Sequence, residues 1–262
     1  MKTGFFQYSV FQHDRGKNLE YIANALRGQS FDLLVLPELF TCGYSFDAVR
    51  PVALFAEVLD DSPTVRTLQG LASSCGGVIT GTIPENCSGL LYNTALLVGS
   101  SGLIGVQRKI HLPDYEKQFF AAGNKISAFD IGRAKIGMMS CFDSWFPAFG
   151  ACLKQDGAQI LCNSASFGGA VTPMILPIRA LENQVFVVSC NRIGTEDFHG
   201  VPETFCGKSR IISPDGRILA SAEGEEKRTF VEIDLDEIRH PAFGSLICKD
   251  FAAEHGKYKI RL

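Results

Sequence analysis

Long hydrophobic runs are lacking in this sequence of 262 residues, which nowhere contains about 18 consecutive apolar residues. Because a membrane-spanning helix needs such a run, we expect no membrane helix and no membrane partner. The apolar patch at residues 4–11 is short and interrupted by Gln, Tyr and Ser, and no small-residue cleavage site follows it. It does not have the pattern of a secretory signal, so we expect a cytoplasmic protein.

An excess of positive charge is also lacking. The chain has 25 Lys and Arg against 28 Asp and Glu, a formal net charge of -3, and its basic residues are scattered. Nucleic acids and anionic membrane surfaces are bound by clusters of basic residues. We therefore expect neither as a partner.

Paired cysteine spacings are lacking as well. The chain has nine cysteines, but none forms a C-x-x-C motif or a zinc-like cluster, so we expect no metal site. An odd number in a chain without a secretion signal indicates reduced thiols. Most of the nine are expected to be small buried side chains, and at most one or two to be chemically distinct.

What the sequence does contain is an alternation of strand-like and helix-like segments. Buried-strand patterns lie at residues 4–11, 31–38, 78–83, 134–141, 158–166, 185–192 and 228–238, helical patterns at 17–28, 64–77, 147–157 and 172–184, and hairpins at 91–111 and 208–222. The last helix starts with a Thr cap and a Pro in its first turn, and the second hairpin turns at residues 214–216. No repeat or linker interrupts the chain, so residues 1–262 are predicted to form a single α/β domain with mixed sheets.

Three polar residues each end a strand-like run. Glu38 follows "LLVLP", Lys109 follows "LIGVQR" and Cys141 follows "IGMMS". Taken singly, each has an ordinary explanation: a solvated loop carboxylate, a surface charge and a buried thiol. Strand ends beside loops, however, are where rigid scaffolds present catalytic groups.

Together the three residue types suit acyl transfer. A thiol is mostly protonated at neutral pH and needs a base before it becomes a good nucleophile. A carboxylate can be that base, and an ammonium near the attacked carbon can stabilise the oxyanion of a tetrahedral intermediate. A Cys, Glu and Lys site therefore needs no histidine.

Five ordered segments of the sequence resemble the carbon–nitrogen hydrolase (nitrilase) superfamily. They are "LPELFTCGY", "RKIHLPDYEKQFFAAG", "CFDSWFP", "RALENQVFVVSCNRIG" and "FCGKSRIISPDG". The resemblance runs from the N-terminal strand to about residue 235 and implies a four-layer αββα sandwich, in which two mixed β-sheets pack face to face. It also implies that this chain has a Glu-Lys-Cys triad and belongs to the amidase-like branch of the superfamily.

Carried over by position, the resemblance makes Cys141 the nucleophile, Glu38 the general base and Lys109 the oxyanion stabiliser. Glu116 matches a second glutamate of the family, which would orient Lys109 and hold the leaving group or water. The backbone N–H of Phe142 would join Lys109 around the oxyanion. The implied reaction is hydrolysis of a small amide through a cysteine thioester, without a cofactor.

The substrate is less well defined by the sequence. Phe-Asp after the nucleophile resembles the amidase branches, whereas nitrilases more often have Trp-Glu there, so a nitrilase or an N-carbamoyl amidohydrolase is the alternative. From other classes, a Cys–His thiol hydrolase using His111 and a catalytically silent scaffold of the same fold remain open. The intact set of four polar residues argues against the scaffold.

The pocket walls are expected to come from Tyr44, Trp145 and the loop at residues 163–169, including Asn163 and Ser166 as substrate contacts. Aromatic and small residues suggest a small, fairly apolar substrate, although Tyr44 and Trp145 are equally compatible with core packing. We find no arginine placed to clamp a substrate carboxylate. By resemblance, a homodimer or higher homo-oligomer is expected, with the tail at residues 240–262 in the contact.

Overall fold

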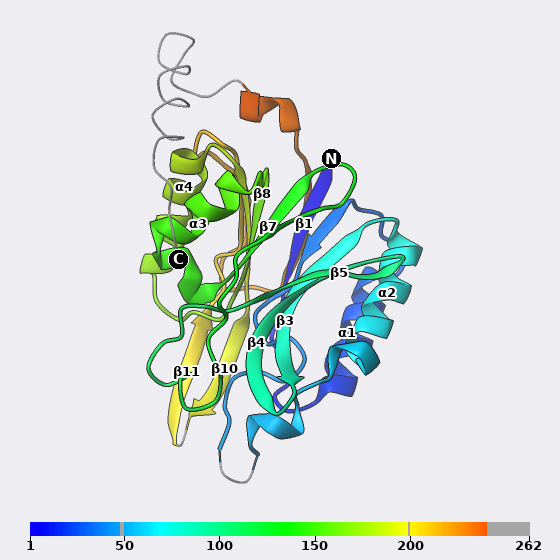
Figure 1. Ribbon diagram of the computed structural model, residues 1–262, viewed down its shortest axis with the longest axis vertical. Helices are drawn as coiled ribbons and strands as arrows, with labels where there is room; N and C mark the ends of the chain where they lie inside the picture. Colours follow the sequence, from blue (N-terminus) through cyan, green and yellow to red (C-terminus); the bar gives the residue numbers. More distant parts are fainter. Residues whose placement is uncertain (48–49, 199, 240–262) are drawn as a thin grey trace.

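The computed structural model describes residues 1–47, 50–198 and 200–239 and consists of two mixed β-sheets packed face to face, with helices on both outer faces (Figure 1). The predicted four-layer αββα sandwich is confirmed. The segment at residues 240–262, for which a dimer contact was expected, lies outside the described residues.

The first sheet has the strand order β14-β1-β2-β3-β4-β5. Its strands are β1 (Lys2–Gln7), β2 (Leu33–Val35), β3 (Val78–Cys87), β4 (Leu90–Gly99), β5 (Gly102–Arg108) and β14 (Lys227–Glu232). The strands β1, β2 and β3 run parallel, and the outer pairs are antiparallel. Buried parallel strands explain why their sequences are continuously apolar rather than alternating.

The second sheet has the order β13-β12-β9-β8-β7-β6 and the same arrangement of parallel centre and antiparallel edges. Its strands are β6 (Ala128–Asp130), β7 (Lys135–Ser140), β8 (Ile160–Ala165), β9 (Phe186–Asn191), β12 (Arg210–Ile212) and β13 (Ile218–Ser221). The turn between β12 and β13 closes where predicted, with the N–H of Gly216 donating to the carbonyl of Ser213.

Helices α1 (Arg15–Leu26) and α2 (Pro63–Cys75) cover the first sheet, and α3 (Pro147–Gln155) and α4 (Val171–Asn183) cover the second (Figure 1). Side-chain caps begin the first two, because Asp14 accepts from the N–H of Lys17 and Ser62 from that of Val65. Gly76 ends α2 with a positive φ of 79°, a conformation that glycine adopts without strain.

The central core fills the space between the sheets. Phe5, Val35 and Leu97 project from the first sheet into one buried cluster with Met138 and Val188 of the second. A second apolar cluster lies between the first sheet and its helices, and a third lies between the second sheet and its helices. Three parallel apolar layers fix the spacing of the sheets, and with it the relative position of loops that leave them.

Some local predictions differ from the structure. Helix α4 begins at Val171 after Ala170 and has no side-chain cap, so the predicted Thr cap is wrong; Thr172 lies inside the first turn. The run at residues 31–38 forms a strand only over Leu33–Val35, because the chain then turns away toward Glu38. The hairpin of β10 (Ile193–Phe198) and β11 (Val201–Cys206) was not expected from the sequence.

Candidate active site

The three strand-end residues come together at one end of the sandwich. Glu38 follows β2 and Lys109 follows β5, both in the first sheet, whereas Cys141 follows β7 in the second. The backbone joins the two sheets here, since the N–H of Glu38 donates to the carbonyl of Ala165 at 3.3 Å, and the Ser166 hydroxyl donates to the carbonyl of Glu38 at 3.2 Å. The site therefore lies across the junction of the sheets.

A fully buried ion cluster lies beside Cys141. Lys109 Nζ lies 2.8 Å from Glu38 Oε1 and 2.5 Å from Glu116 Oε1, and the Tyr44 hydroxyl donates to Glu116. Asn93 donates a further hydrogen bond of 2.8 Å to Glu38 Oε1. The other oxygens, Oε2 of Glu38 and of Glu116, have no hydrogen-bond partner among the described residues. One oxygen of each carboxylate thus holds the lysine, and the other is available to a reactant.

Charges within the cluster set its protonation. Burial lowers the pKa of Lys109, but the carboxylates of Glu38 and Glu116 outweigh this and raise it well above the ordinary value. Burial raises the pKa of Glu116 from 4.5 to about 7, against the opposing effect of Lys109. Lys109 is therefore an ammonium at neutral pH, whereas Glu116 can exchange a proton there.

Cys141 occupies a strained position at the start of the 3-10 helix η3 (Cys141–Trp145). Its φ is 45°, which is uncommon for a residue with a Cβ and is often found at functional sites. Burial, and then the charge of Glu38, raise the pKa of its thiol well above the usual range, although Lys109 opposes them. The thiol is thus neutral when the site is empty and has to lose its proton to a base as it attacks. The N–H of Phe142 lies in the first turn of η3, where backbone N–H groups lack intrahelical acceptors.

Asp143 ties the cysteine segment to the lysine segment. Its Oδ2 accepts from the N–H of Ser140, and its Oδ1 accepts from the N–H of His111 at 2.9 Å and from His111 Nδ1 at 2.8 Å. Asp143 thus combines a local hydrogen bond with a long-range one. The His111 ring stacks on Phe146, and His111 is not among the residues that line the cavity at Cys141, so the geometry does not favour a Cys–His pair.

A cavity of about 430 Å³ opens above Cys141. Of the predicted substrate contacts, Tyr44, Phe142, Trp145 and Ser166 line it together with Cys141. This volume suits a small molecule, and half of the residues in its walls are aromatic. Tyr44 and Trp145 do not serve core packing alone, because both line the cavity.

Asn163 differs from the prediction. Its side chain is fully buried in β8 and donates to the Ser189 hydroxyl at 3.0 Å in the neighbouring strand β9. It is absent from the cavity wall because side chains alternate along a strand, and its direction follows that of Leu161, toward the helices. We therefore remove Asn163 from the set of substrate contacts.

Sequence reasoning missed the residues that hold Tyr44 in place. The buried carboxylate of Glu196 accepts from the N–H of Tyr44 at 2.8 Å and from that of Ser45 at 3.1 Å, and it pairs with the buried Arg192. Gly43 has a φ of 78° and lies against Glu196, where any Cβ would collide with the carboxylate. The sequence shows only that Arg192 and Glu196 are four residues apart. This spacing gives no indication that Glu196 contacts the distant segment that contains Tyr44.

Sequence reasoning also missed Asn93 and much of the outer wall of the cavity. Pro113, Tyr115, Phe198, Glu203 and Phe205 all line it. Phe198, Glu203 and Phe205 belong to the hairpin β10–β11, which has many polar residues and therefore lacks a strong strand pattern.

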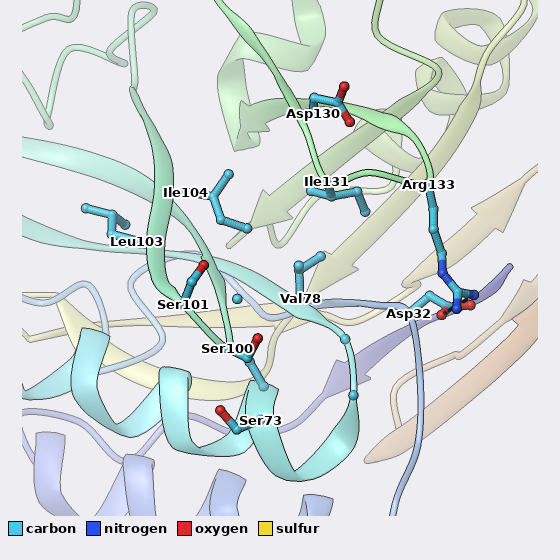
Figure 2. A pocket seen from close by; sticks show the side chains of 14 residues that line it. Asp32, Ser73, Val78, Ser100, Ser101, Leu103, Ile104, Asp130, Ile131 and Arg133 are labelled. Atoms are coloured by element: carbon cyan, nitrogen blue, oxygen red, sulfur yellow. Dashed lines mark ion pairs between the residues drawn. The ribbon is translucent and has the colours of Figure 1, made fainter.

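A larger hollow, about 600 Å³, lies elsewhere and does not suit the chemistry. It lies between the end of α2 and the turn after β4, and in Figure 2 its walls carry Ser73, Ser100 and Ser101, with Asp32 paired to Arg133. None of the residues lining it is a cysteine or a histidine. The smaller cavity above Cys141 is therefore the candidate active site.

Metal binding and membrane insertion are two further properties to consider. Within the described ranges, no group of three or more His, Cys, Asp or Glu side chains is placed to hold a metal ion. No helix in the same ranges combines the length and apolarity needed to cross a membrane.

The comparisons with known proteins agree with this geometry. A nitrilase of Pyrococcus abyssi is 38% identical over 231 residues, covering 87% of each chain, and an (R)-stereoselective amidase of Pseudomonas sp. is 31% identical over 245 residues, covering 91% of this chain and 87% of the other. The crystal structure of Nit3 of Saccharomyces cerevisiae, a member of branch 10 of the nitrilase superfamily, superposes with a TM-score of 0.81 at 27% identity, covering 94% and 96% of the two chains. The family model for carbon-nitrogen hydrolases matches residues 6–242, so the chain belongs to the carbon–nitrogen hydrolase family.

Proposed function

We propose that the protein hydrolyses the carbon–nitrogen bond of a small amide, with Cys141 as nucleophile. The observation that carries this proposal is the position of the Cys141 thiol between an aromatic cavity and the buried cluster of Glu38, Lys109 and Glu116. A nucleophile at the cavity, with an unengaged carboxylate oxygen and an ammonium buried beside it, supplies the parts that acyl transfer requires.

In the first half of the reaction, Cys141 attacks the amide carbon and its proton passes to the free Oε2 of Glu38. The oxyanion that forms is stabilised by the Lys109 ammonium and by the N–H of Phe142. The intermediate then collapses: the carbon–nitrogen bond breaks, Glu38 returns the proton to the leaving nitrogen, and ammonia or an amine departs. An acyl thioester on Cys141 remains.

In the second half, Glu38 takes a proton from water as the water attacks the thioester carbon. The carbon–sulfur bond breaks, the proton is delivered to the thiolate, and the carboxylic acid leaves. Glu116 holds Lys109 on the oxyanion side through its Oε1, while its Oε2 is free to accept a hydrogen bond from the leaving group or from water. Tyr44 fixes Glu116 and forms part of the wall beside the substrate.

A nitrile is the second candidate substrate, and the observation that favours it is the relative of Pyrococcus abyssi, which is named a nitrilase. The same thiol can add to a nitrile carbon, and water then releases ammonia and leaves the same thioester. An N-carbamoyl compound would react as an amide. The three substrate classes therefore share one mechanism and differ in how the cavity holds them.

The test is ammonia release from small aliphatic amides, N-carbamoyl compounds and matching nitriles. We expect amide turnover that falls by at least about 1,000-fold in Cys141→Ser, because the weaker hydroxyl nucleophile would have to be activated by the same base. Cys152→Ser is the matched control: this partly exposed thiol lies in α3, outside the cavity wall, and its loss should leave turnover unchanged.

Activity on nitriles alone would favour the second candidate. No turnover of any class, together with a Cys141 thiol inert to alkylation, would contradict the proposal and leave a scaffold function.

We further propose that the protein is a homodimer and that it acts in the cytoplasm. Support for association comes from helix α4, where Val171, Met174 and Ile178 are 54%, 69% and 51% exposed. Their spacing places them on one face of the helix, and exposed apolar stripes of this kind often mark contacts between proteins.

A further inference from the structure

We propose that Glu203 selects substrates that carry a positively charged group, such as a primary ammonium, at the end remote from the amide. This inference rests on the proposed function and names the substrate class of the same site. It makes Glu203 a specificity-determining residue rather than part of the reacting set.

The charge of the cavity wall is the first observation. Among the described residues that line the cavity, Glu203 alone has a side chain that is charged at neutral pH, and there is no Arg, Lys or His. The other titratable groups of the wall are neutral, because burial raises the pKa values of Cys141, Tyr44 and Tyr115 well above their usual range. The wall thus offers a substrate one full charge, and that charge is negative.

The hairpin geometry places this exposed side chain on the cavity side. Val201, Glu203 and Phe205 alternate along β11, and all three line the cavity, so the two-residue period of the strand places their side chains on the cavity side. Glu203 therefore lies between two apolar contacts, where a substrate chain leaving Cys141 would reach it.

The partner strand leaves Glu203 without a cation. Glu203 is paired in register with Glu196 of β10, and side chains of directly opposite residues share a face of the hairpin. The nearby cation, Arg192, is engaged by Glu196 and lies under the ring of Phe205. No ion pair of Glu203 is found among the described residues, and like charges directly opposite one another are destabilising. A bound ammonium would offset this cost.

The buried cluster beside Cys141 offers no excess of positive charge. Its single cation, Lys109, is paired with both Glu38 and Glu116. A substrate with a distant carboxylate would meet Glu203 with no basic residue in the wall to receive it. A substrate with an ammonium group would be attracted by Glu203.

The first experiment compares three amides of equal chain length: 5-aminopentanamide, hexanamide and adipamic acid, which end in an ammonium, a methyl group and a carboxylate. For the wild-type enzyme we expect kcat/KM to fall in that order. In Glu203→Gln the ratio of 5-aminopentanamide to hexanamide should fall about tenfold, as expected for loss of a charge-assisted contact, and adipamic acid should improve. Glu20→Gln makes the same charge change on the exposed face of α1 and should leave all ratios unchanged.

The second experiment does not need turnover. The Cys141 thiol is alkylated with 2-bromoethylamine or with iodoacetate, and the labelled peptide is quantified, with Cys141→Ser as the background. Each alkylation rate is divided by the rate at which the same reagent alkylates glutathione, which corrects for the different reactivity of the two reagents. The wild type should favour the cationic reagent, and Glu203→Gln should lower that preference about tenfold.

The outcomes separate the two proposals. If hexanamide is hydrolysed but Glu203→Gln leaves the charge preference unchanged in both experiments, the inference is wrong and the amidase proposal stands. If no amide is hydrolysed but the alkylation preference depends on Glu203, the proposed reaction fails while the cation-selective cavity is supported. A wild-type preference for adipamic acid or iodoacetate would overturn the inference directly.

Discussion

Asn93 supports the base of the site although it touches no reactant. It is fully buried in β4 and donates to the same oxygen of Glu38 that receives Lys109, and the other oxygen, Oε2, has no partner among the described residues. A carboxylate with a second donor is held in one rotamer more firmly than one held by a flexible lysine alone. The residue is therefore a positioning residue of the proposed mechanism.

We expect Asn93→Ala to lower kcat about tenfold while KM changes little, because Glu38 would sample rotamers that do not face Cys141. Asn93→Asp should lower kcat by at least about 100-fold, since it places a second carboxylate against Glu38. Steady-state kinetics on the preferred amide measures both. Asn24→Ala, on the exposed face of α1, is the control and should behave as the wild type. Equal kcat values for Asn93→Ala and Asn93→Asp would contradict this role.

Glu116 couples the site to the pH dependence of stability. Burial raises its pKa from 4.5 to about 7, so between these values the folded protein binds more protons than the unfolded chain. Its contribution to stability is therefore present in full below about pH 4.5 and is lost as the pH rises through about 7. In Glu116→Gln the side chain at this position cannot titrate, so the variant does not lose this stability as the pH rises.

Accordingly, the Tm of Glu116→Gln relative to the wild type should increase as the pH is raised from 5 to 8, whatever the offset at pH 5. Thermal unfolding in matched buffers measures the difference. Asp114→Asn is the control, because hydrogen bonding to Lys117 lowers the pKa of Asp114 below 3.8 and places its titration outside this range. A Tm difference for Glu116→Gln that is flat or that falls with pH would show that Glu116 is ionised throughout.

The sequence singled out the residues that we propose to react more readily than the residues that support them. Glu38, Lys109 and Cys141 stand at the ends of recognisable strands and inside family segments, so both position and chemistry pointed to them. Asn93 lies within an apolar strand and Glu196 within a polar one, where neither periodicity nor a motif sets them apart. Their roles depend on contacts between distant segments, such as the one from Glu196 to Tyr44, which only the folded chain creates.

At the scale of elements, the 3-10 helix η3 is the part that determines how Cys141 is presented. The side chain of Asp143 accepts from the N–H of Ser140 before the helix and also from the segment after β5. At the other end, Arg179 of α4 donates to the carbonyl of Ser144 at 2.8 Å. A short helix of this kind is weak by itself, and these two side chains fix it between α4 and the strand end.

We expect Asp143→Ala to reduce the free energy of unfolding by about 3 kcal/mol, since it leaves one buried and two partly buried backbone N–H groups without their carboxylate acceptor. Turnover should fall as well, because the Cys141 and Lys109 segments lose their link. Chemical denaturation and ammonia release test the two effects. Asp130→Ala is the control: this exposed carboxylate caps one turn, and its loss should cost less than about 0.5 kcal/mol.

The elements themselves were predicted unevenly for a physical reason. Segments buried on both faces, such as β8 and β9, are continuously apolar and were visible in the sequence. Half of the residues of the hairpin β10–β11 are exposed, and only Glu196 and Phe205 are buried, so its pattern carries little hydrophobic signal. It nevertheless supplies part of the cavity wall, and substrate choice was accordingly the least predictable property.

At the scale of the whole molecule, the apolar face of α4 is the feature that points beyond one chain. Val171, Met174 and Ile178 lie on the outer layer of the sandwich, away from the cluster that the other face of α4 shares with the second sheet. Arg179 on the same helix contacts η3, so a partner bound to α4 would also steady the segment that carries Cys141.

Met174→Glu should therefore convert a dimeric wild type to a monomer and lower turnover several-fold. Sedimentation velocity at several concentrations measures the first effect. Leu54→Glu is the control, because Leu54 is 66% exposed on a 3-10 helix that belongs to the other half of the chain and should not alter association. A wild type that sediments as a monomer at all concentrations would refute the dimer.

The position of the active site across the two sheets has a consequence for any attempt to divide the protein. A cut between Gly123 and β6 would leave Glu38 and Lys109 on one fragment and Cys141 on the other. Neither fragment would hold a complete reacting set, so catalysis would return only when the two halves rejoined through their shared core. Ammonia release by a mixture of the two fragments would then report that the two sheets have associated.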